Sequence, residues 1–300
     1  MKWMNSVLRM GVMPLAMISA AVSAQEGRGD VVYVPTPQVV VDQMLTMAKI
    51  GPKDFLIDLG SGDGRIVITA AKKYGAQGIG VDLDRYLLGL AREGAKKERV
   101  ADRAQFVEQN LFETDLSKAT VISSYLLPTM NLKLRPKILD LKPGTRVVAH
   151  DYHMGDWYPD EQKDIVVPEK KVGTPGVSYV YLWIVPAKVA GKWQAQVDTG
   201  GKAVPEEITF DQLFQILEGS ARVGPDSTLV RGRLRGNEVT FTTVPKGGSA
   251  QRQEFTGRVS GDTMQGTVRI GEGASARQAN WTAKLVQRAE LRRAADEKSD

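Results

Sequence analysis

The chain has 300 residues, of which 42% are hydrophobic and 25% are charged, and it contains no cysteine. This length is enough for one or two globular domains, and the lack of cysteine excludes disulfide bonds and thiolate zinc sites. The formal net charge is +5, with Lys and Arg interspersed among Asp and Glu. That pattern indicates a solvated surface and argues against a nucleic-acid-binding protein, which needs a one-signed basic stripe.

The N-terminus has the three-part pattern of a secretory signal peptide. Lys2 and Arg9 precede an apolar run that ends at Val22, and small residues lead up to Ala24. The apolar run is shorter than the roughly 20 residues that span a bilayer. We therefore expect residues 1–24 to be a signal peptide and the mature protein to be periplasmic, with no stable membrane insertion after signal removal. An uncleaved leader would instead anchor the protein to the membrane.

A short extended piece and a helix are expected next. Pro35 and Pro37 end the extended piece. Apolar residues then recur at helical spacing on one face, namely Val40, Val41, Met44, Met47 and Ala48.

Strand-like and helix-like segments alternate along the following part of the chain. Strands are expected at residues 55–59, 78–82, 104–109, 119–126 and 146–152, and helices at 65–75, 85–97 and 130–141. This alternation indicates an α/β fold with a doubly wound parallel sheet. The long β-branched segment 177–185 is expected to complete the sheet.

The pattern changes near Pro186. From Gly191 onward, short segments of alternating polarity are separated by Gly, Asn or Asp, with no helical period between them. Eight such strands predict a small up-and-down barrel or a sandwich, and they contain no recognisable catalytic constellation. We expect a first domain over residues 25–187, an all-β barrel-like domain over residues 188–286 and a charged tail over residues 287–300.

The first predicted strand ends at Asp58 and leads into Gly60, Gly62 and Gly64. Glycines at such a turn let the backbone pass close beneath a ligand. A dinucleotide-binding turn is the alternative, but there the third glycine comes one residue later, where this chain has Arg65. An acid just before the glycines would repel a pyrophosphate, whereas it suits a ligand with an ammonium group.

A second acid supports this interpretation. Asp82 ends the next predicted strand, so it is expected beside the glycine turn, in the place where an acid accepts hydrogen bonds from ribose hydroxyls. A ligand with an ammonium group, a ribose and an adenine is S-adenosylmethionine.

Four stretches give the chain a family resemblance over roughly residues 30 to 186. They are YVPTP, IDLGSGDGRIVITAA, NLFETDLSKATVISSYLLP and HDYHMGDWYP. Through them the chain resembles class I S-adenosylmethionine-dependent methyltransferases, and among these the ATP-synthase c-subunit lysine N-methyltransferases and their prokaryotic relatives. The resemblance implies a Rossmann-like fold with a seven-stranded sheet, S-adenosyl-L-methionine as cofactor and a protein lysine as methyl acceptor.

The resemblance also implies which residues bind the cofactor. Many relatives have Asp at the Asn110 position, and Asn retains an oxygen that can accept a hydrogen bond from the adenine amine. The cofactor-binding residues implied are Asp58, Gly60, Ser61, Gly62, Gly64, Asp82, Asn110 and Leu111.

Methyl transfer from a sulfonium depends mainly on the alignment of nucleophile, methyl and sulfur. Substrates bind at the carboxyl ends of the strands in such sheets, so the residues after the fourth and fifth strands are candidates for positioning the acceptor. We assign this catalytic role to Tyr125, Pro128 and Tyr152. His150 and His153 lie close together, but without a third histidine we expect no metal site.

A function of another class is the alternative. Because S-adenosylmethionine is made in the cytoplasm, an exported protein with this fold could be a non-catalytic envelope protein that serves as a ligand sensor or scaffold, with the barrel providing recognition. Transfer of labelled methyl groups to envelope proteins separates the two functions.

Overall fold

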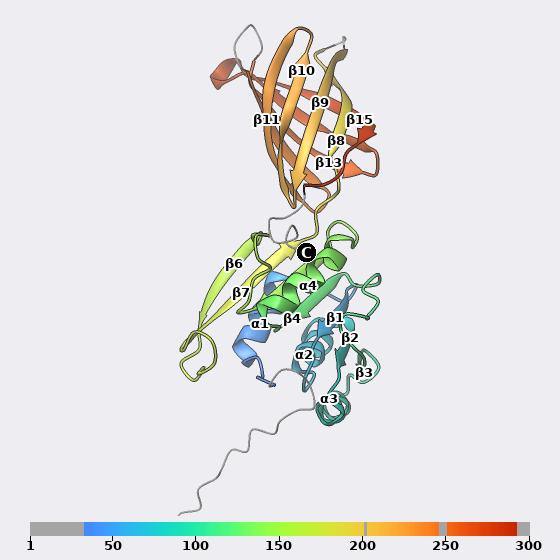
Figure 1. The fold of residues 1–300 in the computed structure, drawn as a ribbon, viewed down its shortest axis with the longest axis vertical. Coiled ribbons are helices and arrows are strands. Elements are labelled where there is room, and N and C mark those ends of the chain that lie inside the picture. Colours follow the sequence, from blue (N-terminus) through green and yellow to red (C-terminus); the bar gives the residue numbers. More distant parts are fainter. Residues whose placement is uncertain (1–32, 201–202, 246–250, 293–300) are drawn as a thin grey trace, which may run out of the picture.

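The computed structural model describes residues 33–200, 203–245 and 251–292. These form an α/β domain and a β-barrel that follow one another along the long axis of the molecule (Figure 1). The leader expected at residues 1–24 lies outside the described residues, as do the last residues of the expected tail.

The α/β domain alternates helices with strands as the sequence predicts. Its helices are α1 (Gln38–Met47), α2 (Arg65–Tyr74), α3 (Arg85–Lys97) and α4 (Pro128–Leu139). Its strands are β1 (Phe55–Leu59), β2 (Gln77–Asp82), β3 (Ala104–Glu108), β4 (Val121–Ser124), β5 (Arg146–His150), β6 (Glu161–Val166) and β7 (Val177–Ile184). None of the helices within the described ranges has the combination of length and apolar character that crossing a bilayer requires.

The seven strands form one sheet in the order β3-β2-β1-β4-β5-β7-β6. Strands β1 to β5 are parallel, which confirms the doubly wound part of the prediction. The sheet is mixed at one edge, because β7 runs antiparallel to both β5 and β6. The connection from β6 to β7, residues 167–176, contains no helix, and a parallel crossover needs about a dozen residues or more, usually with a helix.

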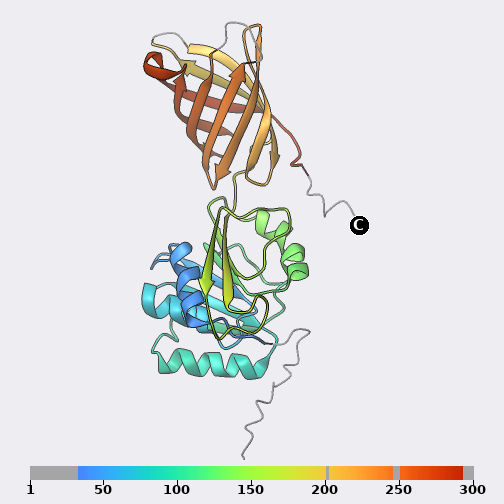
Figure 2. The ribbon, with the colours of Figure 1, turned by 90° about the vertical axis from the view of Figure 1, so that its left-hand side faces the viewer.

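Helices cover both faces of the sheet (Figure 2). One core cluster joins α1, α2 and α3 to the first face, and it includes the apolar residues predicted for α1. The second cluster joins α4 to the other face, through Leu134 and Ile138, together with Trp157 and Trp183. The two clusters confirm the layered α/β architecture.

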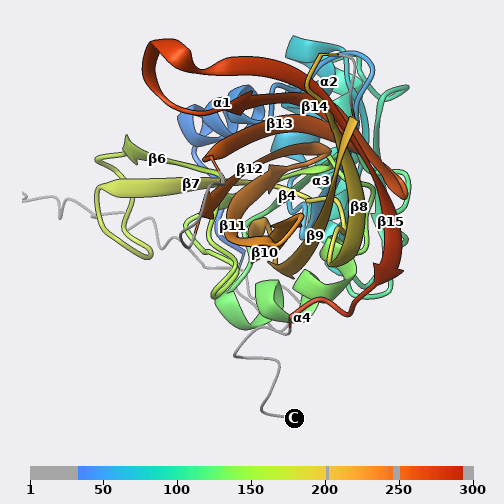
Figure 3. The ribbon, with the colours of Figure 1, turned by 90° about the horizontal axis from the view of Figure 1, so that it is seen from above.

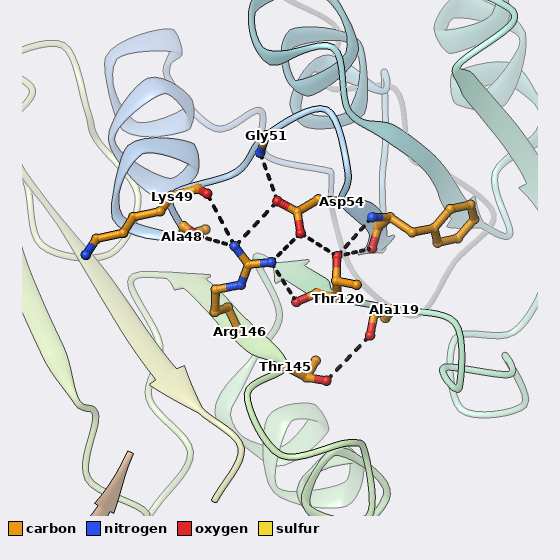
Figure 4. A network of polar contacts seen from close by, with 9 residues as sticks. Ala48, Lys49, Gly51, Asp54, Ala119, Thr120, Thr145 and Arg146 are labelled. Atoms are coloured by element: carbon orange, nitrogen blue, oxygen red, sulfur yellow. Dashed lines mark hydrogen bonds and ion pairs between the residues drawn. The ribbon is translucent and has the colours of Figure 1, made fainter. Parts of the chain in front are cut away.

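A polar cluster connects the amino ends of three strands (Figure 4). Arg146, at the start of β5, pairs with Asp54 just ahead of β1, and Thr120 ahead of β4 donates a hydrogen bond to Asp54 over 2.8 Å. Arg146 also donates to the carbonyl of Ala48 after α1. Burial tends to raise the pKa of Asp54, but these hydrogen bonds and the charge of Arg146 bring it below its ordinary value. The cluster fixes the relative positions of β1, β4 and β5.

The remaining strands close into a barrel (Figure 3). Each strand pairs antiparallel with its neighbours, and the first pairs with the last, so the barrel alternative is confirmed over the sandwich. The interior is filled by apolar side chains that include Trp193, Phe210, Phe241, Phe255 and Trp281. The strands are β8 (Gly191–Asp198), β9 (Ala203–Leu213), β10 (Ile216–Val223), β11 (Asp226–Arg235), β12 (Glu238–Pro245), β13 (Gln253–Ser260), β14 (Thr263–Ile270) and β15 (Arg277–Arg288).

The expected domain boundary at Pro186–Lys188 falls between β7 and β8. The connection between the domains packs against the barrel. Ala187 is buried, and its backbone N–H donates to the carbonyl of Gly236 in the barrel over 2.9 Å. The expected charged tail from residue 287 begins inside β15, which ends at Arg288.

Candidate functional site

A cavity of about 240 Å³ opens at the carboxyl ends of β1, β2 and β4. Its walls come from the segment ahead of α1, the turn after β1, the end of β2, and the loops after β3 and β4. Gly62 and Gly64 belong to the turn without lining the cavity. The other six predicted cofactor residues line it, and they are Asp58, Gly60, Ser61, Asp82, Asn110 and Leu111.

The turn after β1 requires its glycines for two reasons. Gly60, Gly62 and Gly64 have φ angles of +75°, +52° and +78°, a region that other residues seldom adopt. A Cβ on Gly62 would also lie 2.2 Å from the ring of Tyr33, and one on Gly64 would lie 2.5 Å from the ring of Phe106. The turn therefore lets Tyr33 close over it and lets Phe106 of β3 pack behind it.

Asp82 meets the glycine turn directly. One oxygen of its carboxylate accepts a hydrogen bond from the backbone N–H of Gly62 over 2.8 Å, and the other accepts from the N–H of Asp84 over 3.0 Å. Each carboxylate oxygen can accept more than one hydrogen bond. Since Asp82 also lines the cavity, it can hold the turn and accept from ligand hydroxyls at the same time.

Asp58 is a buried carboxyl group at the cavity wall, only 2% exposed. Burial, and to a lesser extent the nearby charges of Asp82 and Asp63, raise its pKa to about 7, against a 2.6 Å hydrogen bond donated by the hydroxyl of Ser123. No cation of the described residues contributes to lowering this pKa. A buried carboxylate favours a cationic partner, so the site suits an ammonium group of a ligand.

A second polar group in the cavity wall, the hydroxyl of Ser61, could form a hydrogen bond with a ligand. The hydroxyl oxygen of Ser61 is buried and has no hydrogen-bond partner among the described residues, an arrangement that costs about 1–3 kcal/mol. S-adenosylmethionine carries an ammonium group for Asp58, ribose hydroxyls for Asp82 and polar atoms within reach of Ser61. The residues present therefore fit this cofactor.

Asn110 and Leu111, in the loop after β3, form another part of the cavity wall. The side-chain oxygen of Asn110 accepts a hydrogen bond from the N–H of Phe112 over 3.0 Å, which sequence reasoning did not anticipate. An amide oxygen has a second lone pair, so Asn110 can still accept from an adenine amine.

Arg65 holds the segment ahead of α1 in place over the glycine turn. Arg65 donates to the carbonyl of Thr36 over 2.8 Å and pairs with Asp63 at 2.6 Å. Burial, together with the Asp63 carboxylate, raises the pKa of Tyr33 to about 12, so Tyr33 is neutral at physiological pH. Arg65, which stands where a dinucleotide-binding turn has glycine, thus closes the wall of the cavity with Tyr33.

The residues predicted to position the methyl acceptor lie around Tyr125, on what we call the acceptor side of the cavity. The centroid of its ring lies 3.9 Å from the centroid of the His150 ring and 6.0 Å from the centroid of the Tyr152 ring. Of the three residues predicted for acceptor positioning, Tyr125 lines the cavity, whereas Tyr152 does not line it but stacks with the ring of Tyr125. Pro128 is exposed at the first position of α4 and does not line the cavity, whereas Leu126 does.

The hydroxyl of Tyr125 donates to the carboxylate of Asp151 over 3.2 Å. Asp151 in turn pairs with Lys170 at 2.6 Å, and both side chains are buried. Burial and the charge of Asp151 raise the pKa of Tyr125. Sequence reasoning missed Lys170, because it lies in a run of charged residues that suggests an exposed loop.

His150 is a buried, neutral connector. Burial lowers its pKa to about 4. Its ring nitrogens lie within hydrogen-bond distance of the hydroxyls of Thr36 (3.2 Å) and Ser178 (2.9 Å). It thus connects the segment ahead of α1 to β7. Within the described part of the chain, no group of three or more potential metal-binding side chains is present.

Comparisons with known proteins match the α/β domain. The family described as the ANTKMT methyltransferase domain matches residues 58–161. A protein-lysine N-methyltransferase of Saccharolobus islandicus is 45% identical over 131 residues, which cover 43% of this chain and 81% of that enzyme. The human lysine N-methyltransferase of the ATP-synthase c-subunit is 33% identical over 129 residues, but the match covers only 54% of its length.

A solved structure also matches this part of the chain. It is an RNA methyltransferase from Salinibacter ruber in complex with S-adenosyl-L-homocysteine. The two sequences are 47% identical, the match covers 52% of this chain and 96% of that chain, and the TM-score is 0.48. The identity and coverage of the Saccharolobus enzyme, together with the family match, establish the relationship. The chain belongs to the S-adenosylmethionine-dependent protein-lysine N-methyltransferases.

Proposed function

We propose that the protein transfers the methyl group of S-adenosylmethionine to the side-chain amine of a lysine in a protein substrate. The observation that carries this proposal is the buried Asp58 carboxyl group, whose pKa is lowered by no cation among the described residues, in a cavity that Asp82 and Tyr125 also line. The names of the relatives support lysine as the acceptor.

The bound cofactor supplies a methyl group activated by a sulfonium. The nitrogen lone pair of the lysine forms the new bond to the methyl carbon as the sulfur–carbon bond breaks, so the lysine must first lose a proton to solvent. The chain's own contribution is positioning. Asp58 would hold the ammonium group of the cofactor and Asp82 its ribose, and Leu126 and Met130 in the cavity wall would provide apolar surroundings that lower the pKa of an entering lysine by desolvation. The Tyr125 oxygen accepts a hydrogen bond from the amine and orients it.

The first prediction concerns Asp82. We expect Asp82→Ala to weaken S-adenosylmethionine binding about tenfold or more, because each lost hydrogen bond contributes about 0.5–1.5 kcal/mol. Asp82→Asn keeps one acceptor oxygen and should lose less. Isothermal titration measures both affinities, with circular dichroism to verify folding. Wild-type affinity in a folded Asp82→Ala variant would show that Asp82 does not bind the ribose.

The second prediction follows from the pKa of Asp58, about 7. Only the ionised carboxyl group pairs with an ammonium group, and below pH 7 the free protein holds Asp58 mostly protonated. Affinity for S-adenosylhomocysteine should therefore level off near pH 8 and fall by up to about tenfold per unit below pH 7. Asp58→Asn should bind weakly with no such pH dependence. A flat wild-type profile between pH 5.5 and 8 would contradict this role.

The third prediction tests the reaction. Tritium from methyl-labelled S-adenosylmethionine should appear in protein when the enzyme is incubated with an envelope extract of the cell that makes it, and amino-acid analysis should recover the label as methyl-lysine. Tyr125→Phe keeps the ring, so it should retain cofactor affinity and slow transfer about tenfold through the lost hydrogen bond. Label in RNA would contradict the proposed acceptor. Cofactor binding without transfer to any acceptor would favour the sensor function.

We further propose that the protein works in the periplasm. The leader pattern of residues 1–24 supports export. Mass spectrometry of the protein isolated from spheroplast supernatant should give an N-terminus at Gln25. An intact Met1 in a protein retained with the membranes would indicate an anchor instead, and a cytoplasmic location would contradict export.

A further inference from the structure

The barrel contacts the α/β domain through the turn between β9 and β10. Phe214 in this turn has a φ angle of +53°, which points its ring away from the barrel interior. The ring stacks on Trp157 with 5.9 Å between centroids, and the guanidinium of Arg135 lies 5.3 Å from its centre. Trp157 and Arg135 are fully buried. Phe214 therefore packs against the core of the α/β domain, not that of the barrel.

Two buried glutamines hold this turn in place. The side-chain amide of Gln212 donates to the carbonyls of Phe214 and of Ala187 in the domain connection, each over 2.8 Å. The side-chain amide of Gln215 donates across the interface to the carbonyl of Tyr158 over 2.7 Å. Figure 1 shows this end of the barrel next to α4. The turn is thus fixed to both domains.

Two partners of the turn, Trp157 and Tyr158, belong to residues 151–158, which follow β5 and which we call the post-β5 segment. Arg135, besides facing Phe214, donates to the carbonyl of Met154 over 3.0 Å and pairs with Asp156 at 2.7 Å. The segment begins at Asp151, the residue whose carboxylate accepts the hydrogen bond from Tyr125 in the cavity wall. A continuous set of contacts therefore leads from the barrel to the acceptor side of the cavity.

We propose that Phe214 and Gln215 are positioning residues for methyl transfer: the barrel holds the post-β5 segment, and with it Tyr152 and Tyr125, in place for the methyl acceptor. This inference rests on the proposed function, because it concerns the acceptor side of the same site. The cofactor carboxylates Asp58 and Asp82 make none of these contacts. Loss of the Phe214 ring should therefore impair transfer while leaving cofactor affinity intact.

The test compares variants of the full chain. Phe214→Gly removes the ring, while glycine readily adopts the positive φ of the turn, so the barrel hairpin should remain. Phe214→Tyr keeps the ring. Arg235→Ala removes a different contact of the same interface, the ion pair with Glu161, and serves as the matched control.

Hydrogen exchange measured by mass spectrometry is the first readout. In Phe214→Gly, amide exchange in residues 151–158 should be at least about tenfold faster, because local opening of the segment becomes easier. The affinity for S-adenosylhomocysteine should stay within about twofold, and tritium transfer to the envelope extract should fall by about ten- to a hundredfold through kcat, as expected of small misplacements. Phe214→Tyr and Arg235→Ala should match the wild type in all three measurements.

Two results would overturn the inference. One is unchanged exchange of residues 151–158 in Phe214→Gly. The other is a loss of cofactor affinity as large as the loss of transfer, which would mean that the barrel only stabilises the fold. Should the wild-type protein transfer no methyl group at all, the proposed function fails, and the exchange and affinity measurements still decide whether the barrel holds the segment.

Discussion

The ion pair between Arg146 and Asp54 sets the positions on which the site depends. Both side chains are largely buried, and backbone carbonyls and Thr120 complete the cluster, so it differs from the exposed pairs that contribute little to stability. With the amino ends of β1, β4 and β5 fixed, the strand register brings Asp58 opposite Ser123. The chain after β4 and the chain after β5 then leave the sheet at the same edge. The chain after β4 forms part of the cavity wall, and the chain after β5 supports it through Asp151.

The proposed site divides into two halves that are held in place by different contacts. The cofactor half consists of the glycine turn and its two carboxylates, and it depends on backbone conformation within β1, β2 and the turn. The acceptor half consists of Tyr125 and the post-β5 segment, and its supports come from farther away in the sequence: Lys170 in the loop before β7, Arg135 in α4 and Phe214 in the barrel. A domain that follows the sheet in the chain can therefore affect the acceptor half without touching the cofactor half.

Local patterns explain what could be predicted from the sequence. The glycine turn, its neighbouring acids and the strands other than β6 depend on short-range spacing, and the structure places them as expected. The missed features depend on contacts between distant segments. β6 is polar and exposed, so it lacks an apolar pattern. Lys170 looks like a surface charge until Asp151 is brought beside it, and Phe214 alternates like a barrel residue although its positive φ turns it outward. Such pairings appear only when the fold is known.

Closure of the barrel has a consequence for the order in which the protein folds. Since β8 pairs with β15, the barrel cannot close without its last strand, and such long-range pairing is slow compared with local contacts. The contacts between the sheet and the helices of the α/β domain, by contrast, form between segments that end with β7. Trp157 and Arg135 lack the ring of Phe214 until the barrel has assembled. We therefore expect folding to complete the cofactor half early and the acceptor half last, which delays competence for methyl transfer until the barrel has closed.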